Sequence, residues 1–222
     1  MRIQKYLSQQ GICSRRQAEK FIDNGWIFVN GECIKEKGIQ IDPENDKIHL
    51  SDEAETLLKQ FTYIKYYKPR GIITHSPQSN EKEIKDIIDP KYRHCFPIGR
   101  LDKDSEGLIL LTDDGQFAKR CLSHENPHRR DYIITVSKPL TREMIRKCET
   151  GIMILGAKTK PCKLKEINKT TYKISLYEGK NRQIRRMIQK VGSKVVTLKR
   201  VQFGPILLGG LQENTLEEIQ AF

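Results

Sequence analysis

The sequence lacks the features that mark membrane-spanning, secreted and metal-binding proteins. Its longest apolar runs, such as residues 108–111, are far too short to cross a bilayer. The N-terminal residues 1–5 contain no apolar signal core. The six cysteines form no Cys-x-x-Cys pair, and the five histidines are scattered without a metal-binding spacing. We therefore expect a cytoplasmic protein with reduced thiols that binds neither a membrane nor a metal.

A glycine-rich loop of the nucleotide-binding type is also missing, and nothing in the sequence calls for an organic cofactor. Positive charge, by contrast, is abundant, with a net charge of +12. Residues 1–60 carry 9 basic and 10 acidic side chains, whereas residues 61–222 carry 31 and 18. A basic surface attracts polyanions, above all nucleic acid, and a solvated lysine-rich surface is the alternative. A membrane-surface protein is disfavoured, because no basic amphipathic helix with large aromatic residues stands out.

The N-terminal part is predicted to form a small helical unit followed by a β-hairpin. An apolar face predicts a first helix that ends at Gly11. Ser14, with Gln17 three residues later, matches a capping box and begins a second helix. The dipeptide at residues 30–31, Asn-Gly, is a strong signal for a tight hairpin turn.

We place a domain boundary near residue 60, so that residues 1–60 form the first domain with its linker and residues 61–222 form the second. Most predicted strands of the second domain lack a full helix between them, which favours an α+β fold with a mainly antiparallel sheet. The predicted strands cover residues 61–67, 108–111, 132–136, 172–176 and 195–203. Predicted helices begin near residues 80, 115, 141 and 181, with Asn80 and Asn181 as candidate caps.

A polar loop bounded by Gly99 and Gly107 leads directly into the buried strand at residues 108–111. Its charged residues are Arg100, Asp102, Lys103, Asp104 and Glu106. A loop held against a rigid strand is a common way to position a catalytic carboxylate. By composition alone, a solvated turn whose charges pair locally is the commoner alternative.

A basic helix is predicted to follow Asn181. Its apolar positions have helical spacing and predict a buried stripe at Ile184, Met187, Ile188 and Val191. Three guanidinium groups lie off that stripe near the start of the helix, on Arg182, Arg185 and Arg186. Such a cluster can grip phosphate or carboxylate bidentately, and a solvated basic face is the alternative.

Tyr132 stands at the start of a predicted strand, two residues after the arginine pair Arg129-Arg130. An aromatic ring beside two cations could stack on a nucleic-acid base. An ordinary core tyrosine is the commoner alternative.

Together these segments resemble the bacterial ribosomal pseudouridine synthases of the RsuA, RluB, RluE and RluF type, over nearly the whole chain. Residues 1–48 resemble an S4 RNA-binding domain. Residues 68–71, Lys-Pro-Arg-Gly, resemble the first motif of the family, residues 99–115 its catalytic motif and residues 178–187 its third motif. Their joint order and spacing are highly specific. The resemblance implies a small helical and hairpin S4 domain followed by an α+β synthase core with a central cleft.

The resemblance also implies roles for individual residues. Asp102 matches the catalytic aspartate, Tyr132 the tyrosine that stacks on the target uracil, and Arg185 the arginine that pairs with the aspartate. Leu176 matches the apolar residue that lines the base pocket, and Arg100 the position that fills the gap left by the flipped base. Further expected RNA contacts are Lys5, Arg15, Arg16, Lys68, Lys180, Arg182 and Arg186.

The implied reaction breaks the N1–C1′ bond of a uridine and joins C5 to C1′ without redox change, so no cofactor is expected. An ionised Asp102 would act as nucleophile or base, and Arg185 would keep it charged. Attack on C1′, attack on C6 and removal of the 2′ proton stay open as first steps. A non-catalytic ribosome-assembly factor on the same fold is the alternative, and only the enzyme requires Asp102, Tyr132 and Arg185 to act together.

The expected partner is ribosomal RNA, bound as structured RNA by shape and phosphate contacts, and the protein is expected to be a monomer. The segment from Lys138 to Lys163 is most similar to the RluF-like subgroup, which acts on large-subunit RNA near the peptidyl-transferase region. Members of that subgroup can also act on a uridine of a transfer RNA anticodon. We therefore expect a uridine of 23S rRNA as the substrate, with a transfer RNA uridine as a second candidate.

Overall fold

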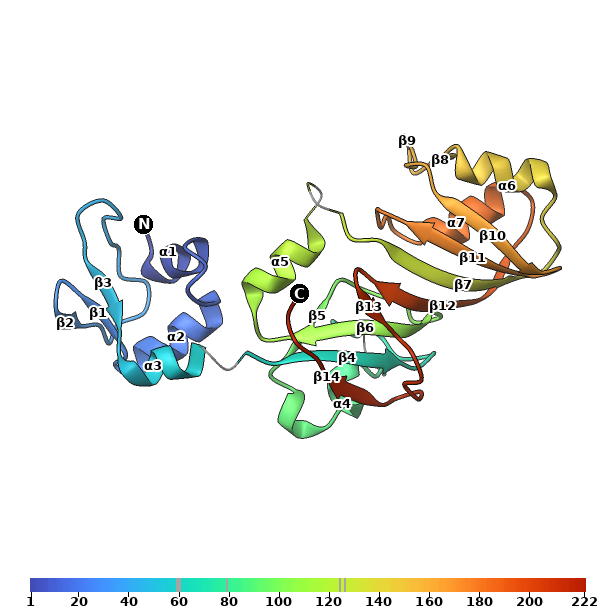
Figure 1. Cartoon of the computed structure of the whole chain (residues 1–222). Helices are drawn as coiled ribbons and strands as arrows, with labels where there is room; N and C mark the ends of the chain where they lie inside the picture. Colours follow the sequence, from blue (N-terminus) through green and yellow to red (C-terminus); the bar gives the residue numbers. More distant parts are fainter. Residues whose placement is uncertain (59–60, 79, 124, 126) are drawn as a thin grey trace. The chain divides into compact units, whose positions relative to one another are not determined.

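The computed structural model describes residues 1–58, 61–78, 80–123, 125 and 127–222 (Figure 1). By their internal contacts these residues form two compact units. The first unit comprises Met1–Tyr63 with Thr112–Arg120, and the second comprises Ile64–Leu111 with Cys121–Phe222. The domain boundary predicted at residue 60 lies outside the described residues. Among the helices of the described ranges, none is long and apolar enough to cross a membrane.

The first 58 residues form three short helices and a three-stranded sheet in the order β2-β1-β3. The elements are α1 (Ile3–Gln9), α2 (Arg15–Asp23), β1 (Ile27–Val29), β2 (Glu32–Cys33), β3 (Ile48–Leu50) and α3 (Asp52–Leu58). The predicted capping box is confirmed, because the side chains of Ser14 and Gln17 each accept a hydrogen bond from the other's backbone N–H, at 3.2 and 3.0 Å. Asn30 and Gly31 both have positive φ, 53° and 86°, as the predicted hairpin turn requires.

The polar turn at Asp113-Asp114 leads into α5 (Gly115–Leu122), as predicted. The carboxylate of Asp114 accepts hydrogen bonds from the backbone N–H groups of Gln116 and Phe117, each at 2.9 Å. These bonds satisfy donors that the first turn of a helix otherwise leaves unpaired.

A sheet of nine strands forms the framework of the second unit (Figure 1). Its order is β10-β11-β7-β12-β6-β4-β14, with β13 paired to β12 and β5 paired to β6. The strands are β4 (Tyr63–Lys68), β5 (Phe96–Ile98), β6 (Glu106–Thr112), β7 (Arg130–Val136), β10 (Lys163–Asn168), β11 (Thr171–Leu176), β12 (Val195–Phe203), β13 (Ile206–Leu207) and β14 (Leu216–Glu218). The predicted α+β class is confirmed: β7 pairs antiparallel with β11 and β12, while β12 pairs parallel with β6.

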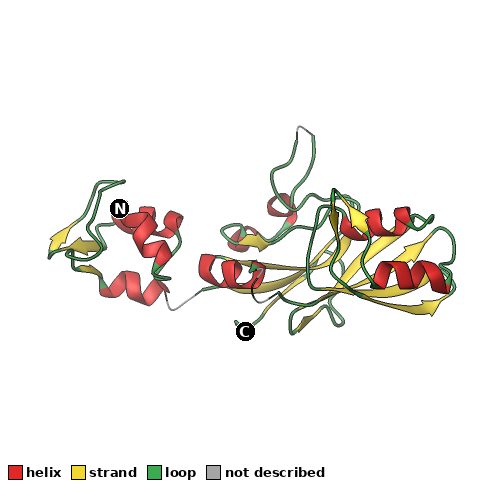
Figure 2. Cartoon of the chain, turned by 90° about the horizontal axis from the view of Figure 1, so that it is seen from above, coloured by secondary structure: helices red, strands yellow, loops and turns green. Residues whose placement is uncertain are grey.

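Two helices pack against this sheet, as Figure 2 shows in red against the yellow strands. α6 (Arg142–Glu149) contacts β10, and α7 (Gln183–Lys190) contacts β12 and the small hairpin of β8 (Met153–Ile154) and β9 (Ala157–Lys158). The predicted stripe of α7 is confirmed, because its four apolar residues are buried in one core with residues of β7 and β11. The arginines of α7 therefore face away from the core.

The predicted helix cap at Asn80 was wrong. The short helix α4 (Ile84–Ile87) begins after Glu83, whose backbone N–H donates to the Asp86 carboxylate at 2.8 Å. A 3₁₀ turn, η1 (Pro90–Tyr92), follows it. The acidic side chain within the helix supplies the cap, so none is needed from Asn80.

The strands β6 and β12 approach each other closely where Gly107 is paired with Arg200. Gly107 has a φ of +100°, and a Cβ built on it would lie 2.3 Å from the carbonyl oxygen of Arg200. Glycine is therefore required here both by the backbone conformation and by the lack of space. This contact sets the position of Arg200 relative to the strand that follows the polar loop.

We expect Gly107→Ala to lower the free energy of unfolding by about 3 kcal/mol or more, because it combines a backbone overlap with a strained φ. Gly210→Ala is the matched control, since a Cβ there meets no atom within 4 Å. Urea unfolding of both variants measures the difference. A loss below about 1 kcal/mol at position 107 would show that the two strands can separate without cost.

Candidate functional site

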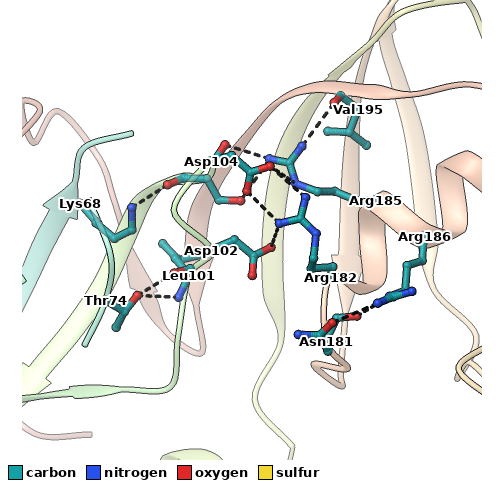
Figure 3. A network of polar contacts seen from close by, with 11 residues as sticks. Lys68, Thr74, Leu101, Asp102, Asp104, Asn181, Arg182, Arg185, Arg186 and Val195 are labelled. Carbon is teal, nitrogen blue, oxygen red and sulfur yellow. Dashed lines mark hydrogen bonds and ion pairs between the residues drawn. The ribbon is translucent and has the colours of Figure 1, made fainter. Parts of the chain in front are cut away.

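A pocket of about 570 Å³ opens in the second unit beside the polar loop. The loop, β7, β11 and the segment before α7 supply most of its lining. The lining residues used below are Arg100, Leu101, Asp102, Tyr132, Leu176, Lys180, Arg182 and Arg185. The pocket thus gathers side chains from all three segments that the sequence singled out. Figure 3 shows the polar contacts around it.

The loop that carries Asp102 is fixed on both sides of this residue. Before it, the buried Thr74 hydroxyl donates to the carbonyl oxygen of Leu101 at 2.7 Å and accepts from its N–H at 3.0 Å (Figure 3). After it, the N–H of Gly71 donates to the carbonyl oxygen of Lys103 at 2.7 Å. Two tertiary contacts therefore position the backbone of a side chain that is itself 34% exposed.

Lys68, at the end of β4, hydrogen-bonds the backbone of the same loop. Its ammonium group donates to the carbonyl oxygens of Pro69 and Ser105, each at 2.8 Å. Burial lowers the pKa of Lys68 to about 8, although Asp102 and Asp104 nearby favour the charged form. The expected RNA contact at Lys68 was wrong, because the residue is fully buried and its donors are directed to the loop backbone.

Arg182 holds the two carboxylates of the loop together. Its Nη1 lies 3.4 Å from Oδ2 of Asp102, and its guanidinium binds Asp104 bidentately at 3.1 and 3.0 Å (Figure 3). Burial opposes ionisation of Asp104, but the hydrogen bonds from Arg182 and the charge of Arg185 hold its pKa below the usual value. The loop therefore presents two carboxylates that share one cation.

Arg185 binds the loop backbone instead of the carboxylate expected from the resemblance. Its Nη2 donates to the carbonyl oxygen of Asp104 at 2.8 Å and to Ser105 Oγ at 3.3 Å, and its Nε lies 3.3 Å from Oδ2 of Asp104. The direct ion pair predicted between Arg185 and Asp102 is therefore corrected: within the described ranges, the arginine paired with Asp102 is Arg182. The backbone acceptors draw Arg185 under the loop, where burial lowers its pKa.

The start of α7 explains why Arg182 reaches the loop. The predicted cap at Asn181 was wrong, because the helix begins after Arg182, whose φ is +49°. The side-chain oxygen of Asn181 accepts a hydrogen bond from Arg186 at 3.3 Å (Figure 3). The left-handed conformation of Arg182 turns the chain sharply before the helix. Arg182 therefore contacts the loop carboxylates, whereas Arg186 contacts Asn181.

The apolar walls of the pocket come from β7 and β11. Tyr132, the third residue of β7, and Leu176, the last residue of β11, are both buried and both line the pocket. Arg100 and Lys180 also line the pocket, and Lys180 donates to the carbonyl oxygen of Lys158 at 2.8 Å. A pocket lined by a flat ring, a branched aliphatic side chain and a carboxylate is suited to hold a planar base with a polar edge.

The remaining predicted RNA contacts divide between the two units. Arg186 lies on α7 outside the lining of this pocket, while Lys5, Arg15 and Arg16 are exposed on α1 and α2 of the first unit. No group of three potential metal ligands occurs in the part of the chain that the structure describes.

Sequence reasoning missed two residues of the site. Thr74 received no role, although a polar residue directly after Ile72-Ile73 can indicate a specific hydrogen bond in a buried setting. Asp104 was one of several loop charges until the structure placed it between Arg182 and Arg185. No local spacing in the sequence connects Asp104 with arginines 78 and 81 residues away.

Several known proteins resemble the chain. Residues 62–190 match the family described as RNA pseudouridylate synthase, and residues 1–48 match the S4 domain. The dual-specificity RNA pseudouridine synthase RluF of Escherichia coli K12 is 39% identical over 216 residues, which cover 95% of this chain and 72% of that protein. The ribosomal large subunit pseudouridine synthase B of Bacillus subtilis is 33% identical over 98% of this chain and 91% of its own length. A crystal structure of a pseudouridylate synthase has a TM-score of 0.72 at 29% identity and covers 99% of this chain and 96% of its own.

The buried lysine predicts an unusual pH dependence of stability. Because the pKa of Lys68 is lowered to about 8 in the folded protein, the unfolded chain binds more protons between about pH 8 and 10.4. The contribution of this lysine to the free energy of unfolding should therefore rise with pH across that window, by up to about 3 kcal/mol.

The measurement is urea unfolding of the wild type and Lys68→Met from pH 7 to 10.5. We expect the stability of the wild type relative to Lys68→Met to increase with pH, whereas Lys190→Met, at an exposed lysine, should give a nearly constant difference. If the difference in unfolding free energy between the wild type and Lys68→Met did not change with pH, the pKa of Lys68 would not be lowered.

Proposed function

Because the chain belongs to the RNA pseudouridylate synthase family, we propose that it isomerises a specific uridine of large-subunit ribosomal RNA, with Asp102 as the catalytic carboxylate. Family membership makes the protein an RNA-modifying isomerase with an S4 domain and a pseudouridine synthase fold, as the sequence resemblance predicted. The observation that carries the site assignment is the position of Asp102 in a pocket walled by Tyr132 and Leu176.

The reaction matches a site built from a carboxylate, a cation and a flat wall. The N1–C1′ bond of the uridine breaks, the detached uracil turns, and C5 forms a new bond to C1′. C5 then loses its proton, and N1 ends with one. Substrate and product contain the same atoms and the reaction involves no change of oxidation state, so the proposed reaction consumes no oxidant, reductant or co-substrate.

Asp102 is proposed to start this sequence as an ionised carboxylate. Attack on C1′, attack on C6 and removal of the 2′ proton are all steps that a carboxylate can perform at this position. The guanidinium of Arg182 lies 3.4 Å from Oδ2 of Asp102, where it would orient the carboxylate for any of these steps. Arg185 would act through the backbone, by holding the loop between residues 104 and 105.

The target base must leave its stack to reach the pocket, which costs a few kcal/mol. Stacking on Tyr132 would return about 1–3 kcal/mol of this, and Leu176, on the same face of the sheet, would extend the apolar surface beside it. Arg100, which also lines the pocket, would occupy the space that the base has left. The burial of Tyr132 supports a rigid stacking surface whose ring does not need to be ordered on binding.

The substrate assignment rests on the relatives and on the first unit. One relative is named as a dual-specificity RNA enzyme and another as a large-subunit ribosomal enzyme, so we propose 23S rRNA first and a transfer RNA uridine second. The exposed cations Lys5, Arg15 and Arg16 of the S4 domain would dock on phosphates of structured RNA. We further propose that the protein acts as a monomer in the cytoplasm, where that RNA is found.

The proposal predicts that Asp102→Asn abolishes pseudouridine formation while RNA binding and folding are retained. The substitution keeps the size of the side chain but removes the charge that acts in catalysis. The measurement maps pseudouridine across the total RNA of cells that lack the gene and carry either the wild type or Asp102→Asn.

One rRNA site that regains pseudouridine only with the wild type would name the substrate and support the catalytic role. If the variant restored the site equally well, another residue would have to be the catalyst. If no RNA changed while the purified protein still bound rRNA, the ribosome-assembly alternative would replace the enzyme.

Substitutions of Arg182 and Arg185 are expected to differ in their effects on kcat and on stability. Arg182→Gln removes the direct partner of Asp102 from an exposed position, so kcat should fall about 10–100-fold with little change in stability. Arg185→Gln removes hydrogen bonds to the loop backbone from a side chain that is only 13% exposed, so stability should fall as well, by about 2–3 kcal/mol. Single-turnover kinetics and urea unfolding separate the two effects. Equal stability of the two variants would contradict the assigned contacts of Arg185.

A further inference from the structure

We call the pocket that contains Asp102 the uridine pocket, after its proposed substrate. A second pocket, of about 280 Å³, lies beside it and shares the side chains of Arg100 and Tyr132 with it. We call it the Arg200 pocket. Its cationic lining residues are Arg100, Arg130 and Arg200, and Phe203 lies among them. Neither the sequence patterns nor the proposed chemistry gives this pocket a role.

Arg200 is an unusual charge for the interior of a sheet. The residue is 2% exposed, and its Nε donates to the carbonyl oxygen of Leu108 at 2.6 Å. Its Nη2 is buried without a hydrogen-bond partner, and no carboxylate in the described ranges forms an ion pair with it. Burial lowers the pKa of Arg200, and the charge of Arg130 acts in the same direction, although the neighbouring Tyr132 opposes both. Tyr132 also forms a side-chain hydrogen bond with Arg200. Buried charges are normally paired with an opposite charge, so a buried guanidinium with no carboxylate partner in the described ranges suggests that an anion completes the site.

The other arginines add to this positive charge. The guanidinium carbons of Arg130 and Arg200 lie 5.0 and 5.6 Å from the centre of the Phe203 ring, so two like charges share one aromatic side chain. Within the described residues, neither Arg100 nor Arg130 forms an ion pair, whereas the adjacent Arg129 binds Asp131 at 2.7 Å. Nearby acids are therefore committed to other cations.

The acidic residue of the lining, Glu178, does not neutralise the cluster. Its carboxylate accepts hydrogen bonds from the N–H of Lys160 and from the side chain of Gln183, each at 2.8 Å, and lies 3.8 Å from the ammonium of Lys180. With three arginines and this one carboxylate, the lining has an excess of positive charge.

We propose that the Arg200 pocket binds a phosphate group of the RNA strand next to the target uridine. This inference rests on the proposed function and names a contact on the same substrate. Guanidinium groups bind phosphate oxygens bidentately. A phosphate would therefore be the negatively charged partner that Arg200 and Arg130 lack among the described residues. Because Tyr132 and Arg100 line both pockets, a phosphate held here would fix the strand while the base enters the uridine pocket.

The test uses the full chain and a fluorescein-labelled single-stranded RNA of nine nucleotides with one central uridine. Fluorescence anisotropy at several salt concentrations gives the slope of log affinity against log salt. We expect Arg130→Gln to reduce the magnitude of this slope by about 0.7, the value for one lost phosphate contact on a single strand, and to weaken binding about tenfold at low salt. Arg142→Gln, which removes the same charge from an exposed position on α6, should leave the slope unchanged.

Arg200→Gln is the second variant, and its folding is checked by thermal unfolding because the residue is buried. If it folds, it should reduce the slope as Arg130→Gln does. If it does not fold, Arg130→Gln still decides. Equal slopes for the wild type, Arg130→Gln and Arg142→Gln would overturn the proposal, as would equal losses of slope in Arg130→Gln and Arg142→Gln.

Two further measurements distinguish an RNA phosphate from a free anion, and the phosphate contact from the proposed reaction. The first is an NMR titration of the protein with inorganic phosphate. Saturable changes in the chemical shifts of the Arg130 side chain, together with an unchanged salt slope of RNA binding in Arg130→Gln, would assign the pocket to a free anion and overturn the RNA contact. Pseudouridine formation by the wild type on rRNA from cells that lack the gene is measured separately. If the wild type forms pseudouridine but the slopes are equal, only the phosphate contact fails. If it forms none but the slope falls at Arg130, only the proposed function fails.

Discussion

The hydrogen bonds to the backbone between residues 101 and 105 are the constraint on which the rest of the site depends. Thr74, Gly71 and Lys68 hold this segment from one side, and Arg185 holds it from the other. Each of these groups binds a backbone atom, and Arg182 and Arg185 add contacts to the side chains of Asp104 and Ser105. Asp102 can therefore remain partly exposed and free for substrate while its backbone is fixed, which is the preorganisation that a catalytic carboxylate needs.

The cationic side chains of the second unit fall into two groups, those that hold the loop in place and those that line a pocket. Lys68 is buried and Arg185 is half-buried, and both donate to carbonyl groups of the loop, so their charges support the loop. Arg182 bridges the two loop carboxylates and links support to chemistry. Arg100, Arg130 and Arg200 lack carboxylate partners within the described residues and surround the neighbouring pocket. The excess positive charge of residues 61–222 thus has separate local purposes.

The sheet explains how distant segments meet at one place. β7 lies between β11 and β12, which brings Tyr132 beside Ile174 on one side and Arg200 on the other. β12 then pairs in parallel with β6, and Gly107 allows the two backbones to approach closely. The loop before β6 is in this way placed over the ends of β7 and β11. The uridine pocket and the Arg200 pocket share Tyr132 because this residue stands at the centre of the arrangement.

The sequence by itself determined the elements whose signals are local. The Ser14 capping box, the Asn30-Gly31 turn and the apolar stripe of α7 were all predictable, because each depends on residues a few positions apart. The resemblance of the ordered motifs indicated the family, and it named Asp102. Only the tertiary structure decided which arginine contacts which aspartate, that Lys68 is buried, and that Arg200 lacks a carboxylate partner among the described residues. These facts depend on side chains that lie about 80 residues or more apart or in different strands, and no periodicity in one chain encodes such distances.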